Sequence, residues 1–164
     1  MPPVRILFVC MGNICRSPTA EGVMRALVAE AALEDMIELD SAGTGGWHAG
    51  DPPDARSVAA ARRRGIMVDG AARRISPADF ERFDLLIALD ASNASGLMSV
   101  APDERAAAKV RLLREFDPES AAGADLDVPD PYYGGEDGFD HVLDLVDAAC
   151  KGLLDEVRSR AGAA

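Results

Sequence analysis

The chain has 164 residues, and its 17 basic and 28 acidic side chains give it a formal net charge of −11. This acidic balance argues against nucleic acid and anionic membrane as general partners, because both need a basic face. The length suits one domain with its own core, and we expect a single domain over residues 1–164. Because the net charge is negative, an anionic substrate would have to be held by a local site that works against the field of the whole molecule.

No apolar stretch approaches the roughly 18 residues that a membrane helix needs, and residues 1–6 lack the zones of a signal peptide. The three cysteines cannot all pair within one chain, and their spacing indicates no disulfide framework. We therefore expect a cytoplasmic protein, because the cytosol keeps thiols reduced.

The first half of the chain alternates strands and helices. The apolar run of residues 4–10 predicts a strand that is buried on both faces. Ser17, followed by a proline, predicts a helix start with the serine as N-cap. Residues 37–42 predict a second strand, and a helix is expected to follow Asp54 and to end near Gly65.

The second half continues the alternation. Residues 76–79 predict a helix start with an acidic residue at the capping-box position, and residues 85–89 and 110–113 predict two more strands. A long last helix has an apolar inner face of Phe139, Val142, Leu143, Val146, Cys150, Leu153 and Val157. The pattern favours an α/β fold with a parallel sheet covered on both faces. Such sheets bind ligands beyond the carboxyl ends of their strands, and the first strand ends at Cys10.

The loop after the first strand reads Cys10-Met11-Gly12-Asn13-Ile14-Cys15-Arg16-Ser17. Successive backbone N–H groups folded around a helix N-terminus make a concave anion site. Gly12 and Asn13 tolerate backbone angles that most residues avoid. Arg16 can set its planar fork against two phosphate oxygens, and the same groups would stabilise the Cys10 thiolate. The loop therefore predicts a phosphate site with a cysteine nucleophile.

Simpler interpretations exist for these residues. A cysteine at the end of a buried strand usually fills core space, and Cys-x5-Arg often occurs by accident, but the position between a strand and a helix start favours the phosphate site. The sequence lacks the Gly-x4-Gly-Lys-Ser/Thr loop of nucleoside-triphosphate enzymes. Cys10 and Cys15 lack two further ligands at metal-site spacing, and His48 and His141 are the only histidines. We therefore expect no metal.

Three segments together resemble the low-molecular-weight protein tyrosine phosphatases. They are the loop of residues 10–18, the Ser-Ala-Gly-Thr turn of residues 41–44, and the Asp-Pro-Tyr-Tyr-Gly segment of residues 130–134. The order and spacing of elements match that family from about residue 4 to residue 158. The resemblance implies a three-layer, flavodoxin-like α/β fold, with a four-stranded parallel sheet of order 2-1-3-4 and helices on both faces. It also implies a protein-tyrosine-phosphatase that acts on phosphotyrosine-containing proteins.

The resemblance assigns roles to individual residues. Cys10 would attack phosphorus and form a phosphocysteine intermediate, and Asp130 would act first as general acid and then as general base. Without the family, Asp130 reads only as a turn residue before a proline. No cofactor is implied, and phosphate and other oxyanions would inhibit. The phosphate-binding residues would be Met11, Gly12, Asn13, Ile14, Cys15, Arg16 and Ser17.

Side chains around the loop would support it. Asn13, Ser41 and Ser17 would fix the loop backbone by hydrogen bonds, and Ser17 would also stabilise the Cys10 sulfur. Members of the family usually carry a histidine near Gly70 that braces the asparagine, and this sequence has none there. Another group must therefore brace Asn13, or the brace is absent.

Aromatic residues would form the substrate wall. Trp47, Tyr132 and Tyr133 would enclose a slot for a phenyl ring, too deep for phosphoserine. Each aromatic alone is more simply a core residue, and His48 is more simply a solvated loop histidine. Relatives that prefer phosphoarginine tend to carry threonine at the loop position of Ile14, whereas isoleucine suits a tyrosine ring.

Alternatives remain for the second cysteine and for the function. Cys15 would form a protective disulfide with Cys10 under oxidation, or it simply packs beneath the loop; Cys150 reads as a core residue. A non-hydrolysing phosphotyrosine-binding module is the main alternative function. An arsenate reductase would need further cysteines between Cys15 and Cys150, and a protein arginine phosphatase would suit a threonine in place of Ile14. We expect a monomer or weak self-association.

Overall fold

Four parallel strands form one sheet in the order β2-β1-β3-β4. The computed structural model describes residues 2–123, 125–135 and 137–160, so both ends of the predicted domain, residue 1 and residues 161–164, lie outside the described residues. The predicted fold class and strand order are confirmed. The strands are β1 (Val4–Cys10), β2 (Ile37–Gly43), β3 (Leu85–Ala88) and β4 (Val110–Leu112).

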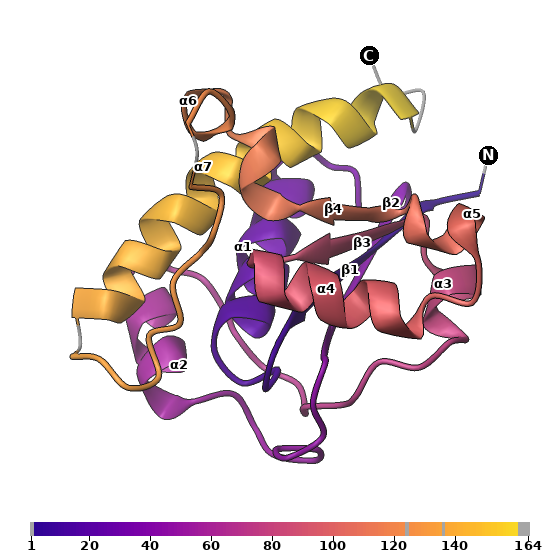
Figure 1. Ribbon diagram of the computed structural model, residues 1–164. Coiled ribbons are helices and arrows are strands. Elements are labelled where there is room, and N and C mark those ends of the chain that lie inside the picture. The colour runs from indigo at the N-terminus through magenta and orange to yellow at the C-terminus, as the bar shows by residue number, and fades with distance from the viewer. Residues whose placement is uncertain (1, 124, 136, 161–164) are drawn as a thin grey trace.

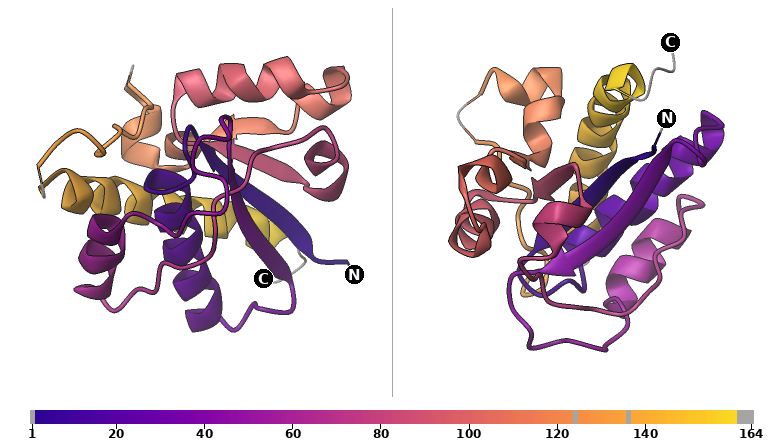
Figure 2. Two further views of the ribbon diagram at one scale, coloured as in Figure 1. Left: turned by 90° about the horizontal axis from the view of Figure 1, so that it is seen from below. Right: turned by 90° about the vertical axis from the view of Figure 1, so that its right-hand side faces the viewer.

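Helices cover both faces of the sheet (Figure 1). In the left view of Figure 2, the strands run between α4 on one side and α1 and α7 on the other. No helix among the described residues is both long and apolar enough to cross a membrane. One face carries α1 (Arg16–Glu30), α2 (Ala55–Arg62) and α7 (Asp137–Arg160), and the other carries α3 (Asp79–Arg82), α4 (Ala91–Val100) and α5 (Glu104–Ala107). The 3-10 helix η1 (Leu113–Phe116) and α6 (Pro118–Ala121) follow β4.

The sequence of β1 explains why the sheet has a core on each side. Ile6 and Phe8 pack with α1 and α7, whereas Leu7 and Val9 pack with α3 and α4. Because successive side chains of a strand point to opposite faces, an apolar run throughout is buried on both. The chain passes from β1 to β2 on one side and later to β3 on the other. The crevice at this reversal therefore opens at the carboxyl end of β1, where Cys10 lies.

The first helix differs from the prediction at its start. α1 begins at Arg16 with Cys15 as the N-cap residue, and no side chain caps it. Ser17 lies inside the first turn, so the prediction that it is the N-cap is wrong. The physical reason is that the loop winds directly into the helix, and the Ser17 hydroxyl accepts a hydrogen bond from Asn13 instead.

The remaining differences lie where apolar periodicity is weak. The helix expected from residue 76 starts only at Asp79, whose carboxylate accepts the backbone N–H of Ser76. α4 and α5 were not predicted, although Asp90 and Asp103 cap them as N-cap residues. These helices are short and rich in alanine and serine, so they lack a clear apolar stripe.

Gly152 allows α7 to lie directly against η1, because a Cβ there would lie 1.7 Å from the Phe116 carbonyl oxygen. We predict that Gly152→Ala lowers the free energy of unfolding by about 1–3 kcal/mol, the usual range for overpacking. Denaturant unfolding measures this value. Gly138→Ala is the control, since its Cβ would meet Pro131 at an ordinary 3.5 Å. Equal stability of the two variants would contradict the prediction.

Candidate active site

The loop of residues 10–16 lies at the carboxyl end of β1 and runs into the N-terminus of α1. Asn13 has a φ of 57°, in the left-handed region, and its backbone N–H donates to the Cys10 sulfur over 3.3 Å. The turn after β2 packs against the loop, because the N–H groups of Thr44 and Gly45 donate to the carbonyls of Cys10 and Met11. The loop therefore curves around the sulfur at the end of a helix that favours an anion.

The side-chain amide of Asn13 joins three segments of the chain. Its Nδ2 donates to Ser17 Oγ over 2.8 Å and to Ser41 Oγ over 3.0 Å. Its Oδ1 accepts the backbone N–H of Arg73 over 3.0 Å. The three residues expected to support the loop are thus brought into one cluster. Arg73 was not predicted to support the loop, but its backbone N–H is a brace on Asn13 in a chain without the histidine expected near Gly70.

Ser17 contacts the cysteine directly, with its Oγ 2.9 Å from Cys10 Sγ. The hydroxyl accepts from Asn13, so its own proton is free to be donated. The alternative acceptor, the carbonyl oxygen of Ala42, lies farther away at 3.4 Å. The geometry therefore favours a Ser17 hydroxyl that donates to sulfur and stabilises negative charge on it.

Arg16 is a buried charge held by fixed acceptors. Its Nη1 lies 2.5 Å from Asp90 Oδ2 and donates to the Val128 carbonyl over 3.0 Å. Burial works to lower the pKa of Arg16, but the hydrogen bond to Asp90 and the nearby Cys10 outweigh it and raise that pKa. Arg16 therefore stays charged, and its guanidinium keeps one orientation at the floor of the site.

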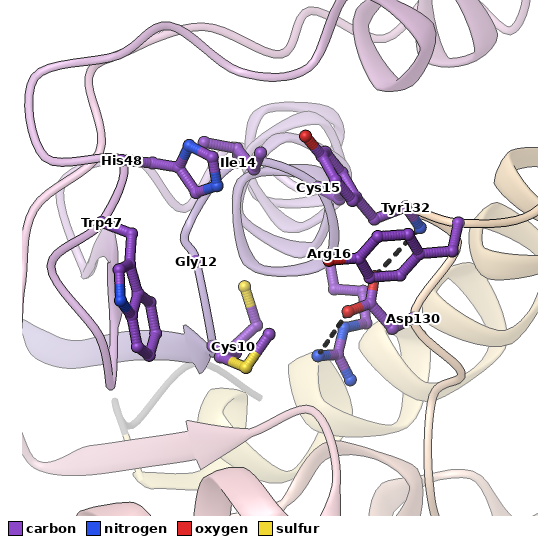
Figure 3. Close-up of a pocket in the computed structure, with 11 residues that line it drawn as sticks. Cys10, Gly12, Ile14, Cys15, Arg16, Trp47, His48, Asp130 and Tyr132 are labelled. Atoms are coloured by element: carbon purple, nitrogen blue, oxygen red, sulfur yellow. Dashed lines mark hydrogen bonds and ion pairs between the residues drawn. The ribbon is translucent and has the colours of Figure 1, made fainter.

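Asp130 lies across from Arg16, with Oδ2 3.7 Å from Arg16 Nη2 (Figure 3). Its other oxygen accepts the backbone N–H of Tyr132 over 3.0 Å and closes a local turn before the tyrosines. The Asp130–Arg16 distance is too long for a hydrogen bond. The two groups therefore form an ion pair at the side of the cavity that both residues line together with Cys10.

A cavity of about 300 Å³ opens above the loop. Figure 3 shows Trp47, His48 and Tyr132 around it and Cys10 at its base. Of the site residues predicted from the sequence, only the supports Asn13, Ser17 and Ser41 do not line it. The lining residues are Cys10, Met11, Gly12, Ile14, Cys15, Arg16, Trp47, His48, Asp130, Tyr132 and Tyr133.

The aromatic residues of the wall are not core residues. Trp47 is 76% exposed and Tyr133 is 89% exposed. A Cβ at Gly45 would lie 1.8 Å from the Trp47 ring, so Trp47 packs over this glycine. His48 lines the cavity with its side chain 34% exposed, and its Nδ1 lies 3.3 Å from an Asp51 carboxylate oxygen, so a solvated loop histidine stays a prediction.

Asp90 contacts the site and was not among the residues predicted from the sequence. One of its carboxylate oxygens contacts Arg16, and the other accepts the backbone N–H of Asn93 to cap α4. Asp90 follows β3, which lies next to β1 in the sheet. Its position after a strand end could therefore have predicted that it lies near Cys10. Among the described residues, no group of three or more His, Cys, Asp and Glu side chains could hold a metal ion.

Residues 5–162 match the sequence profile of the family described as "Low molecular weight phosphotyrosine protein phosphatase". A low molecular weight protein-tyrosine-phosphatase of Streptomyces coelicolor is 55% identical over 156 residues, which cover 95% of this chain and 94% of the relative. The chain belongs to this phosphatase family.

Solved structures of this family superpose on the chain. A protein tyrosine phosphatase of Entamoeba histolytica, crystallised with Hepes in its active site, gives a TM-score of 0.90 at 37% identity and covers 96% of this chain and 98% of its own. A Drosophila arginine phosphatase gives a TM-score of 0.85 at 31% identity, with 93% and 97% covered. The fold is thus shared by one protein named as a tyrosine phosphatase and another named as an arginine phosphatase.

The three thiols of this phosphatase lie in different environments. Burial raises the pKa of Cys15 to about 12, against a hydrogen bond with Ser57 that lowers it. Burial also raises the pKa of Cys150 far above its usual value. Both are therefore protonated thiols at neutral pH, and thiols are poor nucleophiles.

We predict that iodoacetate at neutral pH modifies Cys10 and leaves Cys15 and Cys150 unmodified. Peptide mass spectrometry of the alkylated chain identifies the labelled cysteine, and inorganic phosphate should slow the labelling. Cys10→Ser is the control and should take up almost no label. Labelling of Cys15 ahead of Cys10 would contradict this prediction.

Proposed function

We propose that this phosphatase hydrolyses phosphotyrosine in proteins through a phosphocysteine intermediate on Cys10. One observation carries the proposal: the Cys10 thiol, the Arg16 guanidinium and the Asp130 carboxylate meet in one cavity with aromatic walls. A nucleophile, a phosphate ligand and a proton donor are the three groups that the reaction needs.

In the first step, the Cys10 thiolate attacks phosphorus and the bond from phosphorus to the phenolic oxygen breaks. Arg16 and the loop N–H groups hold the equatorial oxygens as charge redistributes. The carboxyl group of Asp130 gives its proton to the departing phenolate oxygen. Because Arg16 is fixed by Asp90 and Val128, it needs no rearrangement to act.

In the second step, water attacks the phosphocysteine and the phosphorus–sulfur bond breaks. The Asp130 carboxylate takes the proton from this water and regains its acid form. The Ser17 hydroxyl, 2.9 Å from the sulfur, stabilises the thiolate as it leaves. Inorganic phosphate is the product and would also bind as an inhibitor.

The substrate class follows from the depth and walls of the cavity. Tyr132 and Trp47 would lie beside a phenyl ring, and Ile14 would contact it from the loop. A phosphoserine side chain is shorter, so it would not carry its phosphate past these walls to the loop. Ile14 in place of the threonine of phosphoarginine enzymes favours phosphotyrosine over phosphoarginine.

Hydrolysis of matched phosphotyrosine, phosphoserine and phosphoarginine peptides tests the function. We expect the phosphotyrosine peptide to be favoured and Cys10→Ser to be inactive. Asp130→Asn should slow the reaction roughly 100-fold or more, the usual contribution of a general acid.

Asp125→Asn is the matched control, because it removes a carboxylate of the same segment whose Oδ1 accepts a hydrogen bond from the backbone N–H of Asp127. It should retain nearly full activity. Tight binding of phosphopeptide by the wild type without turnover would instead identify a non-hydrolysing phosphotyrosine-binding module. Faster hydrolysis of the phosphoarginine peptide would identify an arginine phosphatase. An arsenate reductase is disfavoured, because Cys150 is fully buried and cannot relay a disulfide.

We also propose that peroxide oxidises the Cys10 thiolate to a sulfenic acid, and that the Cys15 sulfur then displaces the hydroxyl group as water and closes a disulfide. A cytosol would otherwise keep the free thiols reduced. Because the pKa of Cys15 is raised to about 12 by burial, closure should be slow at neutral pH and faster as the pH rises toward this value. The disulfide should protect Cys10 from irreversible oxidation. The measurement is the fraction of activity that returns when a thiol reductant is added after peroxide treatment. Equal recovery by wild type and Cys15→Ser would contradict it.

A further inference from the structure

We propose that Arg56 is the residue that positions the general-acid segment, residues 130–133, over the phosphate loop. The inference rests on the proposed function of Asp130. Arg56 does not line the catalytic cavity, so it acts through other residues and does not touch the substrate. Its contacts connect the two halves of the active site.

The first connection runs from the phosphate loop to the start of α2. The backbone N–H of Asp54 donates to the Ile14 carbonyl over 2.8 Å. Asp54 is the N-cap of α2, and its carboxylate accepts the backbone N–H of Arg56 over 2.8 Å. Asp54 therefore fixes the position of Arg56 relative to the loop, through one main-chain hydrogen bond and one side-chain helix cap.

The second connection fixes the direction of the Arg56 side chain. Its Nε and Nη2 donate to the two oxygens of Asp54 over 3.0 and 2.9 Å. Such a paired contact holds the plane of the guanidinium, which a lysine ammonium could not do. This plane lies over the Phe139 ring, at 4.7 Å from its centroid.

The third connection reaches the acid segment. Arg56 Nη2 donates to the Tyr132 carbonyl over 3.1 Å, and the guanidinium lies 5.5 Å from the Tyr132 ring centroid. The backbone N–H of the same tyrosine donates to Asp130 Oδ1. Among the described residues, the bond from Arg56 is the sole hydrogen bond that residues 129–135 receive from a residue distant in the chain; the neighbouring Gly138 N–H also donates to the Gly135 carbonyl. Pro131 is the buried apolar anchor of the segment, and Tyr132 and Tyr133 are exposed.

Loss of Arg56 should therefore let the acid segment shift while the phosphate loop stays intact. A general acid that is displaced by about 1 Å can lose a large share of its effect. The loss depends on the leaving group, because a good leaving group departs without a proton and a poor one needs it. A general loss of stability would slow all substrates equally.

The test is a series of aryl phosphates, from phenyl phosphate to 2,4-dinitrophenyl phosphate, with Arg56→Met, Arg56→Lys and Asp130→Asn. We expect Arg56→Met to lower kcat/KM about 10-fold for phenyl phosphate and less than about 2-fold for 2,4-dinitrophenyl phosphate. Inhibition by inorganic phosphate should be unchanged. Arg56→Lys, which keeps the charge and the aliphatic stem, should show a smaller loss with the same dependence and serves if Arg56→Met does not fold.

Arg64→Met is the matched control, because Arg64 also donates to a carbonyl, that of Asp140, and pairs with Asp144 away from the acid segment. This variant should not lower kcat/KM for one aryl phosphate more than for another. Equal losses across the series in Arg56→Met, or full activity, would overturn the positioning role while Asp130→Asn still showed its own leaving-group dependence. An Asp130→Asn variant without such dependence would instead remove the proposed acid, and this inference with it.

Discussion

The side-chain amide of Asn13 is the contact on which the phosphate site depends. Asn13 is buried and has a left-handed backbone, and both features cost free energy unless the surroundings compensate. Its three hydrogen-bond partners, Ser17, Ser41 and the N–H of Arg73, come from α1, from β2 and from the segment before α3. The shape of the loop is therefore set by the packing of the sheet and its helices, and not by the loop alone.

Arg16 is the residue that would let a strongly acidic protein hold the proposed phosphate dianion. The net charge of −11 repels phosphate at long range, but salt screens this field beyond about 8 Å. Within the site, a buried guanidinium and backbone donors dominate because they are close and fixed. Asp90 holds the guanidinium through Nη1 and leaves Nη2 facing Asp130. The carboxylate that orients the cation is thus separate from the one proposed to transfer protons.

The parallel sheet and the loop could be predicted because their signals are local and strong. β1 is apolar throughout, and Cys10 to Arg16 connects a strand to a helix. The N-cap of α1 could not be predicted correctly, because the Ser17 hydroxyl bonds to the Asn13 amide, which is also held by Ser41 of β2, and serves the site instead of the helix end. Arg73 was missed because it contributes a backbone group, which leaves no residue-type signal. The comparisons establish the family, and the roles of the site residues remain predictions.

The brace on Asn13 has a consequence for how this site tolerates change. A cavity of about 70 Å³ lies beside Asn13, Ser41 and Gly70; no atom would crowd a Cβ at Gly70, but its φ of 102° strains any side chain there. The brace instead comes from the main chain at residue 73, and nineteen of the twenty amino acids carry that N–H; only proline lacks it. A substitution other than proline would therefore keep the brace, but it would leave Asp40 and the buried Asp79 without the guanidinium that now pairs with them.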